Sequence, residues 1–134
     1  MSHPTSDAAE QAFYEAFRTG NLAAMREIWA AHDSIYCIHP RGEPLLGREA
    51  VLNSWRDILG RGAVGIHAEP LSSSVGANLA IHLVTEQLLD PDGRIVGLVL
   101  ATNVYELTDQ GWRMLMHHAS PAPAPTAARG QPLH

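Results

Sequence analysis

The sequence contains no lysine, so all nine of its basic residues are arginines. Without a side-chain amine the protein cannot form a Schiff base with a carbonyl substrate, which excludes that form of covalent catalysis. The formal net charge is −5, and the arginines are scattered along the chain. Nucleic acids and anionic membranes attract clustered positive charge, so we expect neither as a partner.

Cysteine is nearly absent as well. The single thiol, Cys37, excludes an internal disulfide and fits a reducing compartment. No apolar run approaches the roughly 20 residues that span a bilayer, and the first residues lack the pattern of a secretory signal. The motifs of nucleotide triphosphatases, dinucleotide-binding proteins and serine hydrolases are also missing. We therefore expect a cytoplasmic protein, and 134 residues suit one domain.

The first half of the sequence is predicted to be helical. Apolar residues recur at helical spacing over 9–17, and Asp7 and Glu10 are expected to cap this helix. Asn21 is expected to cap a short second helix. The strongest apolar stripe, over 51–59, predicts a third helix.

The second half is predicted to be an antiparallel sheet, because its segments are β-rich and separated by turn residues. A further short strand is expected between the second and third helices. The predicted strands cover 34–39, 64–75, 78–90, 94–107 and 111–120.

These elements predict an α+β fold in which a curved, cone-shaped, mixed but mainly antiparallel sheet packs against three N-terminal helices. One domain is expected over 6–120. Residues 121–134 are rich in proline and alanine, and we expect a disordered tail there.

The segment from Ile95 to Ala101 is apolar on both of its alternating faces. The helices can cover only one face of the sheet. We expect a second copy of the chain to cover the other, giving a homodimer through the outer sheet face. Coverage by neighbouring long loops is the alternative.

A bent sheet closed by helices leaves a conical hollow, into which a few polar side chains are expected to project. His39 ends the first strand, and a neutral imidazole can shuttle protons near pH 7. Asn103 lies within an apolar strand, where an unpaired amide costs about 1–3 kcal/mol to bury. It therefore needs a partner, and it could hold a developing oxyanion. Alternatively, His39 bonds a backbone carbonyl and Asn103 bonds another protein group.

His117 and His118 are neighbours on the last strand, so only one of them can enter the hollow. We assign His118 to the catalytic group, with His39 and Asn103, and His117 to the surroundings of the pocket. His82 is isolated in sequence and is compatible with a surface position. No two histidines have the spacing of a metal-binding pair on one element, so we expect neither a metal nor another cofactor.

Glu86 lies in the middle of a strand between apolar stretches. Facing inward, its carboxyl group would have a raised pKa and could act as an acid or base, whereas an outward register would leave it in solvent. The aromatic residues are most simply core, with Trp55 near the mouth of the hollow. The residues expected to line the pocket are Phe13, Tyr14, Phe17, Trp55, Glu86, Tyr105 and His117.

Several short motifs resemble those of a known family. They are FYEAF at 13–17, GNL at 20–22, CIHP at 37–40, LGREAV at 46–51, ATNVY at 101–105 and HHAS at 117–120. Together they resemble the SnoaL-like members of the nuclear-transport-factor-2-like superfamily over about 6–120. Similar motifs occur in proteins likened to the association domain of calcium/calmodulin-dependent kinase II. The superfamily hosts isomerases, cyclases, dehydratases and assembly domains, so the resemblance implies a fold more than an activity.

The related ketosteroid isomerases use a carboxylate base and an oxyanion hole of tyrosine and protonated aspartate. The resemblance implies that these three positions correspond to His39, Phe13 and Asn103, so all three identities differ here. Steroid isomerisation by that constellation is not expected. A basic His39 facing the amide of Asn103 still fits proton transfer beside a carbonyl group.

Two functions remain as expectations. The first is a small-molecule-binding protein that acts as a cofactor-independent isomerase or lyase on a small apolar or aromatic carbonyl compound. The second is a non-catalytic ligand-binding or dimerisation module.

Overall fold

A computed structural model describes residues 2–123. Its elements are α1 (Ser6–Thr19), α2 (Leu22–Ile28), β1 (Tyr36–Ile38), β2 (Leu45–Leu46), α3 (Arg48–Leu59), β3 (Gly65–Val75), β4 (Leu79–Leu89), β5 (Ile95–Thr108) and β6 (Gly111–Pro121). The strands form one sheet in the order β2-β1-β6-β5-β4-β3. All neighbours in this sheet are antiparallel except β1 and β6, which are parallel. The predicted α+β class with a mixed, mainly antiparallel sheet is confirmed.

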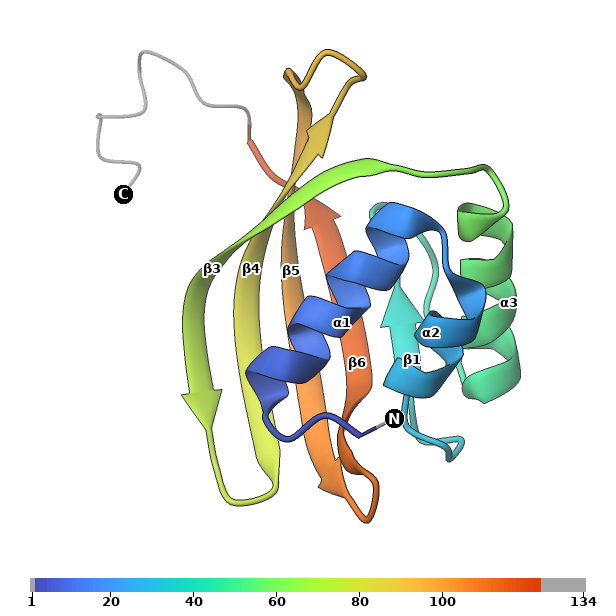
Figure 1. The fold of residues 1–134 in the computed structure, drawn as a ribbon, viewed down its shortest axis with the longest axis vertical. Coiled ribbons are helices and arrows are strands. Elements are labelled where there is room, and N and C mark those ends of the chain that lie inside the picture. Colours follow the sequence, from blue (N-terminus) through green and yellow to red (C-terminus); the bar gives the residue numbers. More distant parts are fainter. Residues whose placement is uncertain (1, 124–134) are drawn as a thin grey trace.

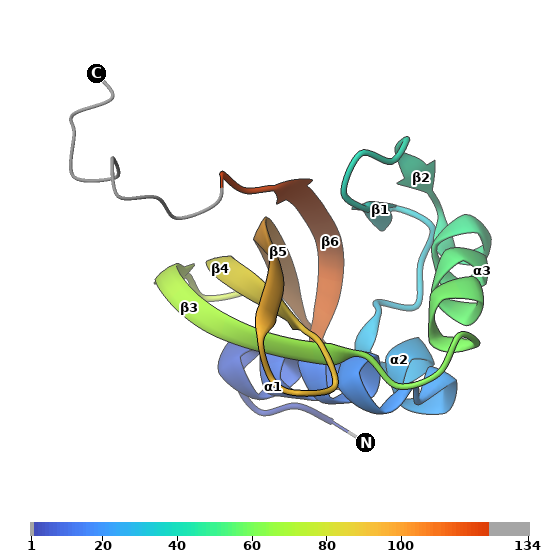
Figure 2. The ribbon, with the colours of Figure 1, turned by 90° about the horizontal axis from the view of Figure 1, so that it is seen from above.

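The helices lie on one side of the curved sheet (Figures 1 and 2). α1 buries Ala9, Phe13 and Ala16, which recur at helical spacing, against the inner face of the strands. It begins after Thr5, whose side chain accepts a hydrogen bond from the amide of Ala8 at 3.0 Å. The predicted cap at Asp7 is therefore wrong: Thr5 satisfies the free amide of the first turn.

The most consequential irregularity of the sheet is a bulge between β5 and β6. Val104 pairs with Met116, whereas the next residue, Tyr105, pairs with Met114. Leu115 is thus an extra residue on β6, and a bulge of this kind reverses the alternation of inward and outward side chains beyond it.

Two short segments differ from the predictions. Leu45–Leu46 pairs with β1 as β2, a strand that the sequence did not predict. Two residues are too few to give a periodic signal. The predicted tail over 121–134 begins too early, because Pro121 ends β6 and the Ala122 amide donates to the Leu98 carbonyl. The rest of that prediction, at 124–134, lies outside the described residues.

The core fills the space between the helices and the inner sheet face. Its largest fully buried side chains include Phe13, Trp29, Trp55 and Tyr105. Within residues 2–123, none of the helices has both the length and the apolar character needed to cross a membrane.

Candidate functional site

A network of buried polar side chains lies between α1 and the inner face of the sheet. α1 contributes two of them, and the strands β4, β5 and β6 contribute the rest. The members are Glu10, Tyr14, His82, Glu86, Asn103, Tyr105 and His117, and all of them are buried. Such groups are stable in an apolar interior only when they are bonded to one another.

Asn103 is at the centre of this network. Its amide nitrogen donates to the Tyr14 hydroxyl at 3.0 Å and to Glu10 Oε1 at 3.1 Å. Its carbonyl oxygen lies 2.5 Å from His117 Nδ1. The partner that the sequence required for Asn103 is therefore a set of protein groups. Both of its amide hydrogens are used, so holding an oxyanion would require breaking one of these bonds.

The hydrogen bond to Asn103 determines the tautomer of His117. Because the Asn103 oxygen can only accept, His117 Nδ1 must carry the hydrogen and Nε2 carries a lone pair. The pKa of His117 is lowered to about 3, mainly by burial, with smaller contributions from positive charge on His39 and His118. His117 is therefore neutral at pH 7, with its basic nitrogen 4.0 Å from Glu86 Oε2.

Glu86 faces inward and is 3% exposed, so the solvent-facing alternative is wrong. Burial raises its pKa to about 7, with a contribution from the charge of Glu10. The Tyr14 hydroxyl donates to Glu86 Oε2 at 2.7 Å and partly offsets this rise, because it stabilises the carboxylate. A carboxyl group that titrates near neutral pH can both accept and release a proton.

Glu10, which was predicted only as a capping residue, is the second carboxylate of the network. Tyr105 donates to its Oε1 at 2.9 Å, and His82 Nδ1 lies 3.0 Å from its Oε2. A surface position for His82 is therefore wrong. The sequence contained a signal for both residues. Glu10 is three and four residues before Phe13 and Tyr14 on the buried face of α1, and His82 lies four residues before Glu86 and therefore on the same face of β4.

His39 lies just beyond β1 and is half-buried. The Ser54 hydroxyl donates to the Val51 carbonyl at 2.7 Å, so it accepts from His39 Nε2 at 3.0 Å. Neutral His39 then has its lone pair on Nδ1. Burial lowers the pKa of His39, which favours this neutral, basic form.

The rings of His39 and His117 lie side by side, with centroids 6.4 Å apart. Both rings also contact Trp55, at 5.0 and 6.0 Å. Through His117, the structure brings His39 close to Asn103, two residues that are 64 positions apart in sequence.

His118 does not join this group. Counting alternate residues from buried Met114 would turn His118 inward, but the extra residue Leu115 reverses the alternation. His117 and Ala119 are buried as a result, and His118 is exposed on the opposite face. The assignment of His118 to the catalytic group is therefore wrong, and His117 occupies the inward position.

The aromatic residues expected to line a hollow pack against one another. Phe13 contacts Trp55 edge to face at 5.4 Å, and Phe17 contacts Trp55 at 4.9 Å. Cys37 is fully buried behind His39, and burial raises the pKa of its thiol, with a contribution from the charge of Glu86. It is not a reactive thiolate.

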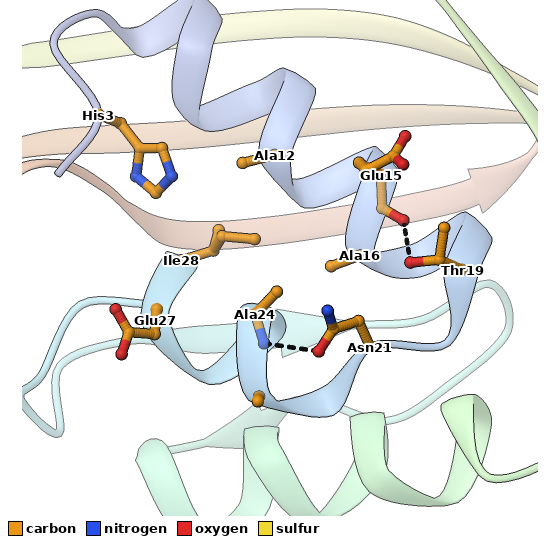
Figure 3. Close-up of a pocket in the computed structure, with 10 residues that line it drawn as sticks. His3, Ala12, Glu15, Ala16, Thr19, Asn21, Ala24, Glu27 and Ile28 are labelled. Atoms are coloured by element: carbon orange, nitrogen blue, oxygen red, sulfur yellow. Dashed lines mark hydrogen bonds between the residues drawn. The ribbon is translucent and has the colours of Figure 1, made fainter. Parts of the chain in front are cut away.

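Two sizeable cavities flank α1. One, of about 490 Å³, lies between α1 and α2 and is walled by small residues such as Ala12, Ala16 and Ala24 (Figure 3). None of the predicted site residues lines it. The other, of about 840 Å³, lies between α1 and β3, and its wall includes Glu10 and Tyr14. Glu86, Asn103 and His117 do not line this groove, nor does His39.

Comparison with known proteins gives a consistent family. The model of the SnoaL-like domain matches residues 7–125. A solved candidate calcium/calmodulin-dependent protein kinase type II association domain from Thiobacillus denitrificans is 40% identical, with 92% of this chain and 99% of that chain covered and a TM-score of 0.87. A candidate dehydratase of the NTF2-like family from Streptomyces avermitilis is 32% identical, with 89% and 94% covered and a TM-score of 0.78.

More distant matches show the fold alone. A ketosteroid isomerase-like protein from Erwinia carotovora atroseptica is 13% identical, with 88% of this chain and 94% of that chain covered and a TM-score of 0.70.

The F-box protein SKIP8 of Arabidopsis thaliana is 28% identical over 109 residues, which are 81% of this chain and 46% of that protein. The chain thus spans about half the length of this curated relative.

Proposed function

The chain belongs to the SnoaL-like domain family, and we propose that it binds a small carbonyl compound and moves a proton on it. The observation that carries this proposal is Glu86, a buried carboxyl group whose pKa of about 7 suits proton exchange at neutral pH. It lies 4.0 Å from the basic nitrogen of a neutral histidine, His117, within the buried polar network between α1 and the sheet. Site elements of this kind are typical of acid–base chemistry.

In this proposal His39 is the base. Its Nδ1 lone pair removes a proton from the carbon next to the carbonyl group, and the developing negative charge moves to the carbonyl oxygen. Protonated Glu86 supplies a hydrogen bond or a proton to that oxygen. Asn103 is a positioning residue, because its bonds hold Tyr14 and His117 in place.

The reaction class follows from where the proton goes next. Returning it to a different carbon isomerises the substrate. In a dehydration, protonated His39 instead gives the proton to a hydroxyl group on the neighbouring carbon, which leaves as water. Neither step transfers electrons to or from an acceptor, so no redox cofactor is required. His39 and His117 are flanked by the rings of Trp55 and Phe13, and these apolar surroundings favour a small apolar or aromatic substrate.

Exchange of carbon-bound hydrogen for solvent deuterium tests the proposal without knowledge of the natural substrate. We expect the protein to accelerate this exchange next to the carbonyl of 2-tetralone or acetophenone in D₂O, followed by proton NMR. His39→Ala should lower the rate about a hundredfold or more, which is the usual contribution of a general base.

The chain offers a matched control for this experiment. His118→Ala removes the same type of side chain from the exposed face and should leave the exchange rate and the melting temperature unchanged. Exchange no faster than in buffer, or equal rates in the His39→Ala and His118→Ala variants, would contradict the proposed role.

A second candidate function is self-association through the outer sheet face. On β4, alternate residues Leu79, Ile81 and Leu83 are 44%, 46% and 37% exposed, and Leu71 on β3 is 55% exposed. Apolar side chains in such a row are usually covered by a partner. The relative at 40% identity, which carries the name of an association domain, also favours this reading. We propose that a second copy of the chain covers this face, giving a homodimer.

Light scattering coupled to size-exclusion chromatography tests this assembly. We expect a dimer for the native chain and a monomer for Ile81→Glu, because a buried unpaired charge would be introduced twice at a symmetric interface. Leu46→Glu is the control, since Leu46 is 71% exposed on β2 at the other end of the sheet. A native monomer, or a dimer that Ile81→Glu leaves intact, would refute the interface.

A further inference from the structure

A cavity lined by arginines lies at the other end of β6, away from His39 and His117. It encloses about 420 Å³, and its walls are formed by Ala23, Arg26, Glu27, Arg48, Gln110 and Arg113. Three of the chain's nine basic residues thus meet at one place in a protein whose net charge is −5. Because the three arginines are far apart in the sequence, the sequence alone did not predict this cluster.

The fold brings the three arginines together from separate elements. Arg26 is on α2, Arg48 begins α3 and Arg113 follows the first residues of β6. α2 is held against β6 by a bridge between Trp29 and Met114, so its last turn lies beside the start of that strand (Figure 1).

Arg48 has a structural role in this arrangement. Its guanidinium donates to the Trp29 and Ala30 carbonyls at 3.1 and 2.8 Å and to the Arg26 carbonyl at 2.9 Å. It thereby satisfies the backbone after α2 and forms a fixed wall of the cavity. Burial lowers the pKa of Arg48, and the positive charges of Arg26 and Arg113 lower it further, as expected for guanidinium groups that are close together.

Arg113 retains unused donors. Its side chain is 9% exposed; Nη2 donates to Gln110 Oε1 at 2.8 Å, but the buried Nε has no hydrogen-bond partner within residues 2–123. Glu106, its neighbour across the β5–β6 ladder, is bonded to His32 instead. A buried guanidinium nitrogen without an acceptor is costly, which indicates a place for one.

Arg26 is exposed, and no carboxylate of the described residues lies within salt-bridge distance of it or of Arg113. Glu27 contributes one negative charge to the wall, so the cavity has an excess of two positive charges. Planar guanidinium groups with several free N–H donors match the oxygens of a phosphate group, and two excess charges match a phosphate dianion.

We propose that this cavity is a binding site for a phosphate group, either free or carried by a small molecule. Arg26 and Arg113 bind the oxyanion, and Arg48 holds the backbone that positions Arg26. The site is separate from the proposed proton-transfer site, because Arg113 precedes His117 on β6 by four residues, about 13 Å of extended strand.

NMR titration of the isotope-labelled protein with sodium phosphate at fixed ionic strength tests the site. We expect saturable shifts of the Arg113 Nε–H signal and of the backbone amides of Arg26 and Arg48. Arg26→Gln should weaken phosphate binding about tenfold, because it removes a hydrogen bond between charged groups. Arg26 is exposed, so this variant is expected to fold.

Arg61→Gln is the matched control, since it removes the same charge from an exposed position beyond the far end of α3. It should change the affinity less than twofold. Titrations with glycerol phosphate and with acetate distinguish the possible ligands. Tighter binding of inorganic phosphate or of glycerol phosphate than of acetate supports the site. The tighter of the two phosphates shows whether the ligand is free phosphate or a phosphate carried by a small molecule. Shifts that do not saturate, equal losses in Arg26→Gln and Arg61→Gln, or tighter binding of acetate would overturn the proposal.

Discussion

Replacing Glu86 by glutamine tests the electrostatics of the buried network directly. Glutamine has nearly the same shape and still accepts the hydrogen bond from Tyr14, but it cannot ionise. In the folded protein the pKa of Glu86 is about 7, compared with an ordinary value of 4.5. This difference corresponds to about 3 kcal/mol between the two protonation states.

The sign follows from proton binding. Between pH 4.5 and about 7 the folded protein holds a proton on Glu86 that the unfolded chain has released, so the native protein loses stability as pH rises through this window. Glu86→Gln lacks this loss. We therefore expect the free energy of unfolding of Glu86→Gln, relative to the native protein, to increase by about 2–3 kcal/mol from about pH 5 to about pH 8.5.

Urea unfolding followed by tryptophan fluorescence at several pH values provides this comparison. His117 also titrates differently in the folded and unfolded protein, but it is present in both proteins and its contribution largely cancels in the difference. Glu49→Gln, at an exposed position on α3, removes the same charge outside the buried network and is the control. A pH-independent difference for Glu86→Gln, or one of opposite sign, would refute the reasoning.

Two further substitutions test the packing. Asn103→Leu should lower the free energy of unfolding by about 3 kcal/mol or more, measured in urea, because it leaves the buried Nδ1–H of His117 without an acceptor and removes the donor that Asn103 supplies to Tyr14 and Glu10. Gly111→Ala should cost more than about 1 kcal/mol, since Gly111 has a φ of +92° and a Cβ there would lie 2.7 Å from the His3 carbonyl oxygen. Gly93→Ala is its control, with a φ of +84° but no atom within 4 Å, and a loss for Gly111→Ala no larger than this control's would contradict the close approach.

The sequence predicted the architecture well because its strongest signals are periodic. The apolar stripe over 51–59 became α3, and the turn residues at 90–93 and 109–111 connect antiparallel strands. The choice between two nearby capping residues was harder to predict. Thr5 and Asp7 are both good capping residues two positions apart, and only the backbone conformation of Thr5 decides between them.

The site was predicted less completely, because its members are joined by contacts between distant elements. His39, Asn103 and Glu86 could be selected individually as polar residues in apolar strands. Nothing local indicates that Asn103 bonds Glu10, which is 93 positions away. The choice between His117 and His118 depended on the pairing of β5 with β6, which alternation along one strand does not reveal.

The extra residue at Leu115 has an evolutionary consequence. In relatives, an insertion or deletion of one amino acid between Met114 and His117 would turn the inward-facing side chains at the end of β6 outward. His117 and Ala119 would then leave the core together. Changes in chain length should therefore be rare there among homologues. They should accumulate instead in the connections at 76–78 and 90–94, where an added residue does not change which side chains face the core.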